Sequence, residues 1–417
     1  MRSSEALALA FDLGTTTIAA SLLNPETGER LASAVRLNPQ RSYGADVVTR
    51  LAAALRSPDA AGSMRSLANG ELDSMAAELA DTAGVAPDAL ISAAVAGNSV
   101  MEHLLLGLPV NSLAYPPYRP LSPAGCTLRT RDLGWAMDMT CRTFPMPGGY
   151  VGGDLVAFLF GAAGGETPCL YLDLGTNGEI ALAEGERLFA TSAAAGPAFE
   201  GGNLACGMVA LPGAIDRVFL DKGRLQMTTI SGCAPAGLCG SGAIAALSLL
   251  LEQGVVDETG RLLAPAEISS NLANHIREMH GEPSFVLYRD AKSSIYLSQN
   301  DIRQIQLAKS AICTGIEVLL SHAGLKRTDL KQVVLTGSFG AVLLPQDLKN
   351  IGIFDENMVK ISRFVHEGAL RGVEAATLAA DDFASLDRLS EAITVIPLSG
   401  TPAFEKNFFT YMNFPKH

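Results

Sequence analysis

The residue types best suited to chemistry occur in two copies of one short motif. The segment DLGTTT begins at Asp12 and the segment DLGTNGE begins at Asp173. Each copy closes an apolar run, which predicts a strand that ends in a turn. Glycine lets the backbone approach a phosphate closely, threonine hydroxyls and turn N–H groups donate to its oxygens, and an aspartate holds Mg²⁺ directly or through water. Two such turns, one in each half of the chain, therefore predict two clamps for phosphate and magnesium.

Composition and charge narrow the class of protein. The 417 residues are enough for two or three domains, and the 48% of hydrophobic residues is enough for packed cores. A net charge of −12 disfavours nucleic acid as a partner. The 7 cysteines form no C-x-x-C pair, no secretory leader is visible, and no apolar run approaches the ~20 residues that span a bilayer. We therefore expect a cytoplasmic protein that binds neither membrane nor nucleic acid.

The elements that position the motifs follow the same order in both halves. In the first half we expect strands at 7–13, 18–23, 30–36 and 91–96, and helices at 46–55 and 64–83. In the second half we expect strands at 169–174, 180–184, 187–191, 332–336 and 393–397, and helices at 301–322 and 368–380. Asn300 is expected to cap the helix 301–322, Gly324 to end it, and Lys309 to lie on its solvated face. Alternating strands and helices in two copies predict a duplicated α/β fold with a cleft between lobes, divided near residue 165.

With these elements in place, the chain resembles the actin, hexokinase and heat-shock-chaperone ATPase superfamily. More narrowly, it resembles the ATPase part of the reductive activators of corrinoid proteins. The segments that carry the resemblance occur in family order from residue 7 to about residue 380: FDLGTTT, AGNSVMEHLLLG, GYVGGD, LDLGTNGEI, AAGPAFEGGN, GLCGSG, NDIRQIQLAKSAICTGIEVLL and TGSFG. The resemblance implies a two-lobed actin-like (ribonuclease H-like) α/β ATPase fold. Its duplicated βββαβα lobes are 1–165 and 166–417, with a nucleotide cleft between them.

The resemblance also implies a set of nucleotide-binding residues. The two motifs match the family's two phosphate loops, and the segment 336–340 looks like its adenosine loop. Asp12 and Asp173 are expected to position Mg²⁺ and its waters as the catalytic and metal-binding residues. The residues expected to contact ATP are Gly14, Thr15, Thr16, Thr17, Gly175, Thr176, Asn177, Gly178, Glu179, Gly196, Glu200, Gly337, Ser338, Phe339 and Gly340.

Structural roles remain open for several of these residues. Asp12 and Asp173 can each cap a turn, and Glu179 can be a buried carboxylate at a strand end. The glycines at 337–340 can form an ordinary turn from a strand into a helix.

The implied function is ATP-dependent reactivation of a corrinoid protein or corrinoid-dependent methyltransferase, in which Co(II) is reduced to Co(I). Members of the family carry an iron–sulfur domain, whereas the ATPase part of this chain begins at residue 7. We therefore expect no iron–sulfur cluster in this chain and an external ferredoxin-like electron donor. The resemblance is compatible with a homodimer.

Two alternatives use the same fold. One is an ATP-driven reactivase, or chaperone, that releases damaged cofactor without electron transfer. The other is a small-molecule kinase, for which the sequence offers no identifiable catalytic base. A P-loop ATPase is excluded because no G-x-x-x-x-G-K-[S/T] occurs, and without a D-x-H-x-x-G motif the cobalamin is expected on a partner.

Overall fold

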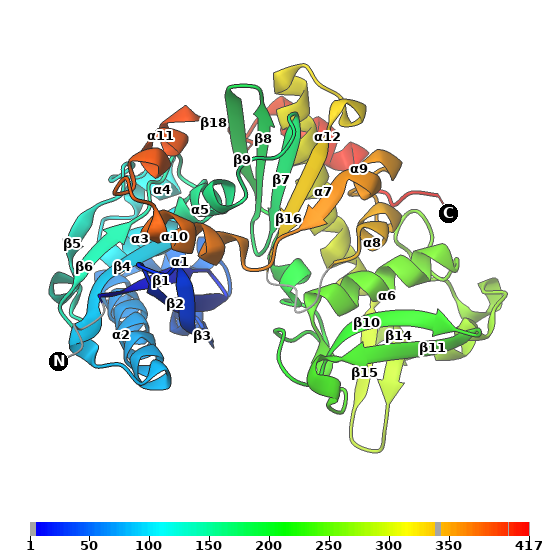
Figure 1. The fold of residues 1–417 in the computed structure, drawn as a ribbon. Helices are drawn as coiled ribbons and strands as arrows, with labels where there is room; N and C mark the ends of the chain where they lie inside the picture. Colours follow the sequence, from blue (N-terminus) through cyan, green and yellow to red (C-terminus); the bar gives the residue numbers. More distant parts are fainter. Residues whose placement is uncertain (1–5, 338–342, 399, 417) are drawn as a thin grey trace. The chain divides into compact units, whose positions relative to one another are not determined.

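The computed structural model describes residues 6–337, 343–398 and 400–416, and these form two compact units (Figure 1). The first unit contains the chain up to Gly165 together with Glu186–Ala190 and Glu367–Val395. The second contains Glu166–Gly185, Thr191–His366 and Ile396–His417. The segment Glu367–Val395 thus packs within the first unit, although it follows most of the second unit in the sequence.

The first unit is built on a six-stranded sheet with the strand order β3-β2-β1-β4-β6-β5. Its strands are β1 (Leu7–Leu13), β2 (Thr17–Asn24), β3 (Glu29–Leu37), β4 (Leu90–Gly97), β5 (Thr127–Arg129) and β6 (Thr140–Thr143). The predicted antiparallel meander of the first three strands is confirmed. Strand β1 runs parallel to β4, with Leu13 paired to Gly97, so the carboxyl ends of both strands lie at one edge of the sheet.

Helices cover this sheet. They are α1 (Val47–Arg56), α2 (Pro58–Ala83), α3 (Ser99–Leu106), α4 (Asn111–Ala114), α5 (Gly153–Gly161), α10 (Gly368–Leu378) and α11 (Ala384–Ala392). Helix α2 contacts β2 and β3, and α10 contacts β1 and β4. Helix α2 starts earlier than expected because the Ser57 side chain accepts from the N–H of Ala60 and Pro58 occupies the first helical position.

The contact between α5 and α10 holds Glu367–Val395 in the first unit. A Cβ placed on Gly372 of α10 would lie 1.7 Å from the carbonyl oxygen of Ala157 in α5, and one placed on Gly161 would lie 2.8 Å from the Cα of Gly372. The two helix backbones therefore touch directly. Only glycine allows so close an approach.

The second six-stranded sheet has the order β17-β16-β7-β8-β9-β18, and most of it lies in the second unit. Its strands are β7 (Cys169–Leu174), β8 (Gly178–Glu184), β9 (Arg187–Ala193), β16 (Gln332–Thr336), β17 (Ser362–Phe364) and β18 (Ile393–Val395). Two three-stranded sheets accompany it, β11-β10-β12 and β13-β14-β15. Their strands are β10 (Ala214–Asp221), β11 (Arg224–Thr229), β12 (Gly237–Leu238), β13 (Ile276–Met279), β14 (Glu282–Arg289) and β15 (Ser294–Ser298).

The helices of the second unit are α6 (Gly240–Glu252), α7 (Gln299–Ala323), α8 (Pro345–Asn350), α9 (Glu356–Ile361) and α12 (Pro402–Thr410). The predicted helix α7 is confirmed, and Gly324 ends it with a left-handed φ of 74°. Its cap is Ser298, not Asn300, because the side chains of Ser298 and Asp301 each accept from the other's backbone N–H. No helix in the described part of the chain is long and apolar enough to cross a bilayer.

The expectation that Lys309 lies on the solvated face of α7 was wrong. Its side chain is only 1% exposed, because the carboxy-terminal segment folds back over the helix. The ammonium group donates to the carbonyl oxygen of Asn413 at 2.6 Å and lies 5.3 Å from the ring centroid of Phe414. A partner from the chain end replaces the water that a surface lysine would have.

Candidate functional site

The first Asp-Leu-Gly-Thr motif forms the hairpin between β1 and β2. Asp12 is paired with Ala19 of β2 and with Ala96 of β4. A Cβ on Gly14 would lie 2.6 Å from the carbonyl oxygen of Thr17, so this tight turn requires glycine. Asp12 and the residues from Gly14 to Thr17 are partly exposed, whereas β1 before them is buried. The hairpin therefore presents its carboxylate and hydroxyls at the surface of the first unit.

Two residues that the sequence analysis missed hold this hairpin in place. The amide Nδ2 of Asn38 donates to the carbonyl oxygen of Gly14 at 2.8 Å. Arg50, which is fully buried, donates from Nη2 to the carbonyl oxygen of Thr15 at 2.7 Å and from Nε to that of Gly44 at 3.0 Å. The available signal was an arginine within the apolar stripe of α1, one position from the buried Leu51.

Replacing Arg50 with methionine is expected to lower the free energy of unfolding by about 1–3 kcal/mol, because the carbonyls of Thr15 and Gly44 lose a buried donor. The loosened hairpin should also weaken nucleotide binding by roughly tenfold, or about 1.4 kcal/mol. Urea denaturation and nucleotide titration measure the two effects. Arg56→Met, at an exposed position of the same helix, is the control. Equal effects at both positions would contradict the bracing role of Arg50.

The second motif forms the hairpin between β7 and β8 in the second unit. Asp173 is paired with Glu179 of β8 and with Thr336 of β16. Because directly paired residues point to the same face of a sheet, these three side chains lie in one row. Glu179 is 6% exposed, and its Oε1 accepts from the hydroxyl of Ser192 at 3.4 Å. The second hairpin thus carries one partly exposed carboxylate next to one buried carboxylate.

The glycine-rich stretch 195–202 brings Glu200 to this second hairpin. Gly196 has a φ of 78°, after which a short 3₁₀ turn, Pro197–Glu200, places the glutamate. The hydroxyl of Thr176 donates to the Glu200 carboxylate, and a Cβ on Gly175 would lie 3.3 Å from Glu200 Oε1. The backbone N–H of Gly175 donates to the carbonyl oxygen of Asn177 at 2.9 Å, which closes the turn. The structure therefore brings Thr176 and Glu200 together.

The segment GLCGSG, residues 237–242, packs against the backbone of the turn that carries Glu200. A Cβ on Gly240 would lie 1.6 Å from the carbonyl oxygen of Phe199, and one on Gly242 would lie 2.0 Å from that of Ile215. The start of α6 therefore packs directly against backbone, and these glycines serve close packing.

Gly337 is the one glycine of the predicted adenosine loop, 336–340, that falls among the described residues. It follows β16 and has a φ of 144°, a conformation that favours glycine. Ser338, Phe339 and Gly340 lie outside the described residues. Gly178 begins β8 directly after the turn of the second motif.

Two neighbouring carboxyl groups, the buried Glu102 and the partly buried Asp154, lie beyond the carboxyl end of β4. Glu102 is fully buried, and its Oε1 accepts from the N–H of Gly97 at 3.1 Å. Its Oε2 and the Nδ2 of Asn98 have no hydrogen-bond partner among the described residues. Burial raises the pKa of Glu102 well above its usual range, and the nearby Asp154 carboxylate raises it further. Burial also raises the pKa of Asp154 to about 6. The segments AGNSVMEHLLLG and GYVGGD supply these groups, but the sequence assigned them no role.

The raised pKa of Asp154 predicts how stability depends on pH. The folded chain holds this proton more tightly than the unfolded chain, so the contribution of Asp154 to stability is fully present below pH ~4 and is lost as the pH rises through about 6. Asp154→Asn is expected to flatten this fall. Urea denaturation between pH 4.5 and 7.5 measures it, with the exposed Asp88→Asn as the control. An unchanged slope in Asp154→Asn would refute the assignment.

The Asp-Leu-Gly-Thr hairpin at the end of a buried strand occurs once in each unit. In each unit the strand before the hairpin also pairs with a parallel strand, β1 with β4 and β7 with β16. This arrangement defines an actin-like ATPase fold, of the class called ASKHA. Family models then match both parts of the chain. The model for the C-terminal domain of RACo, the ASKHA domain, matches residues 167–417, and the model for the RACo middle region matches residues 7–163. The chain belongs to the RACo family.

Similar proteins agree with this assignment. The corrinoid activation enzyme RamQ of Eubacterium limosum is 28% identical over 408 residues, which are 96% of this chain and 69% of RamQ. The [Co(II) methylated amine-specific corrinoid protein] reductase of Methanosarcina barkeri is 26% identical over 219 residues, 47% of this chain and 36% of the reductase. A solved structure, described as a reductive activator for corrinoid, iron-sulfur protein, superposes with a TM-score of 0.91 at 28% identity. The match covers 100% of this chain and 67% of that structure.

Proposed function

We propose that this chain is an ATP-dependent reductive activator of a corrinoid protein or corrinoid-dependent methyltransferase. The observation that carries the proposal is the match to a reductive activator over 100% of this chain, with a TM-score of 0.91. A corrinoid accepts a methyl group as Co(I) and becomes inactive when it oxidises to Co(II). The activator returns it to Co(I) with one electron from an external ferredoxin-like donor. We place this reaction in the cytoplasm.

The residues of each hairpin suit a magnesium nucleotide. Magnesium keeps several waters and takes one or two carboxylates together with phosphate oxygens. Asp12 and Asp173 each offer a partly exposed carboxylate next to a glycine turn. The hydroxyls of Thr15 and Thr16, and the Thr176 and Asn177 side chains, provide donors for phosphate. Bound ATP would supply a phosphoryl group whose transfer to water releases free energy. Asp12 and Asp173 would hold the Mg²⁺ that neutralises the negative charge on the phosphate oxygens.

The nucleotide acts on the partner through the conformation of this chain. A ligand shifts a two-state equilibrium only as far as it prefers one state. If ATP and its hydrolysis products prefer different arrangements of the hairpins, a corrinoid protein that binds one arrangement experiences a different cobalt environment in each. The reduction then becomes favourable in the nucleotide-bound arrangement.

The test is the absorption spectrum of Co(I). The chain, a reduced ferredoxin-like donor, a corrinoid protein in the Co(II) state and Mg-ATP are mixed, and Co(I) is followed with time. We expect Co(I) to accumulate with ATP and to fall to the donor-only level with Asp173→Asn. A spectrum that matches the donor-only control in the presence of the unmodified chain and ATP would reject the proposal.

A further inference from the structure

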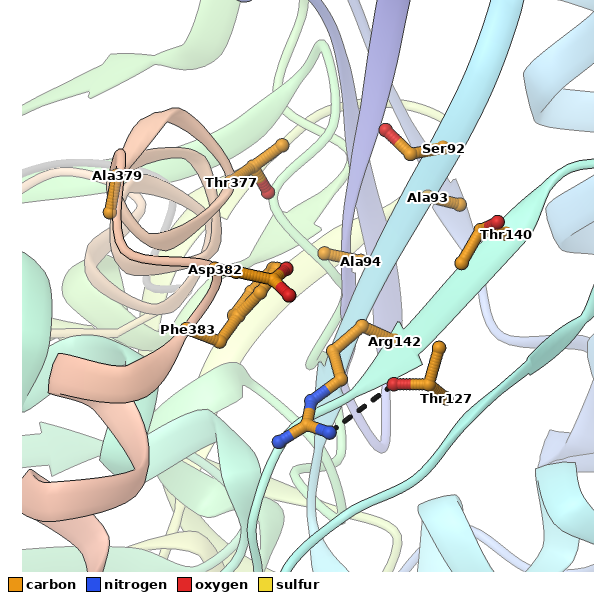
Figure 2. Close-up of a pocket in the computed structure, with 10 residues that line it drawn as sticks. All are labelled: Ser92, Ala93, Ala94, Thr127, Thr140, Arg142, Thr377, Ala379, Asp382 and Phe383. Carbon is orange, nitrogen blue, oxygen red and sulfur yellow. Dashed lines mark hydrogen bonds between the residues drawn. The ribbon is translucent and has the colours of Figure 1, made fainter.

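A pocket of about 310 Å³ lies in the first unit, apart from the residues of the Asp12 hairpin (Figure 2). One wall is formed by β4, β5 and β6, and the other by the end of α10 and the segment that follows it. Residues that carry hydroxyl groups line both walls: Ser92, Thr127, Thr140 and Thr377. In Figure 2, Asp382 and Phe383 face Ala94 and Arg142 across the pocket. A volume of this size is at the lower end for small-molecule sites.

The positive charge of Arg142 is already balanced within the protein. Its Nη2 donates to both carboxylate oxygens of Asp387, at 2.8 and 3.1 Å, and its Nη1 donates to the hydroxyl of Thr127 at 3.3 Å. The guanidinium carbon also lies 5.9 Å from the ring centroid of Phe383. An anionic ligand would have to displace Asp387 to gain this charge.

Asp382 is exposed to solvent and lines the pocket. No hydrogen bond or ion pair joins its carboxylate to another of the described residues. Asp382 and Phe383 have φ values of 49° and 67°, and two consecutive side-chain-bearing residues in the left-handed region are uncommon. Such strain persists where the surroundings hold it, and here the Phe383 ring packs edge-on against Phe144 at 6.0 Å. The packing of Phe383 therefore helps to place the neighbouring Asp382 at the pocket.

We propose that this pocket binds a small organic cation, a protonated amine that also carries hydroxyl or ether groups. Because Arg142 is paired with Asp387, which does not line the pocket, Asp382 is the charged lining residue without an ion pair among the described residues, and its carboxylate suits an ammonium group. The hydroxyls of Ser92, Thr127, Thr140 and Thr377 suit the polar groups beside it. Because the pocket lies between the sheet and the segment after α10, the bound cation ties Glu367–Val395 to the rest of the first unit. The ligand therefore stabilises the packing of this returning segment.

The test measures the melting temperature with ethanolamine hydrochloride or choline chloride, against glycerol and sodium acetate at the same ionic strength. We expect the amines to raise the melting temperature by about 2–4 °C, as a ligand in excess over its dissociation constant does. Asp382→Asn should abolish the shift, since asparagine accepts the left-handed backbone but lacks the charge. Asp221→Asn, at an exposed carboxylate of the second unit, should keep the shift.

A second variant and a second measurement test amine binding independently of the melting temperature. Thr377→Val keeps the shape of the side chain and removes one hydroxyl, and it should weaken amine binding at least threefold in ligand-observed NMR. The proposal is overturned if the amines stabilise no more than sodium chloride, if acetate stabilises more, or if Asp382→Asn responds as the unmodified chain does. None of these results depends on ATP hydrolysis or corrinoid reduction, so failure here is distinct from failure of the proposed function.

Discussion

Asparagine in place of Asp173 is expected to lower magnesium-dependent ATP hydrolysis by about 10²–10³-fold, because a neutral amide holds Mg²⁺ more weakly and the ion's stabilisation of the phosphate charge is then lost. Asparagine has the same shape, so the pairing of β7 with β8 and β16 should survive and the fold should remain intact. What disappears is the carboxylate that we propose holds the metal and its waters. Steady-state hydrolysis at increasing magnesium concentrations measures the loss, and Asp12→Asn should produce a comparable loss from the first hairpin.

The neighbouring Glu179 is the matched comparison for Asp173. It lies in the same row of the sheet, but it is 6% exposed and accepts from Ser192. Glu179→Gln separates the two roles left open by the sequence. If the carboxylate only fills a strand end, the variant changes stability and leaves the magnesium dependence as it was. If Asp173→Asn hydrolyses ATP within about threefold of the unmodified chain, which is less than 0.7 kcal/mol, the catalytic assignment of Asp173 fails.

The sequence was most informative where structure depends on local contacts. Strands β1 to β3 and β7 to β9 follow from short apolar runs and turn residues, and α7 follows from its apolar periodicity. The cap of α7 was misplaced by two residues because Ser298 and Asn300 are both good capping residues. Only the reciprocal hydrogen bonds with Asp301 distinguish them.

The contacts that support the candidate site are long-range, and no periodicity reveals them. Arg50 reaches Thr15, 35 positions earlier in the chain, and Asn38 reaches Gly14, 24 positions earlier. Lys309 finds its partner 104 positions away, at Asn413. In each case the partner was set by tertiary packing, and for Lys309 the sequence pattern also gave the wrong face. The same holds for Glu102, whose burial follows from the approach of the Gly153 turn.

The close contact between α5 and α10, which helps to hold Glu367–Val395 in the first unit, requires glycine at position 372, and this gives a second prediction. Gly372→Ala would place a methyl group 1.7 Å from the carbonyl oxygen of Ala157. That atom belongs to the α5 backbone, so it cannot rotate away as a side chain can. We expect α10 to move off α5 and the free energy of unfolding to fall by about 1–3 kcal/mol or more. Guanidinium denaturation followed by circular dichroism measures the loss.

Gly70→Ala makes the same chemical change with the opposite expected sign. Gly70 is an exposed position within α2, and a Cβ there meets nothing within 4 Å. Alanine removes the backbone entropy cost of a helical glycine, so this variant should be more stable by about 0.5–1 kcal/mol. The opposite signs separate helix propensity from steric contact, because both variants gain the same propensity. Were Gly372→Ala as stable as Gly70→Ala, the two helix backbones would not touch, and another contact would have to hold Glu367–Val395 in the first unit.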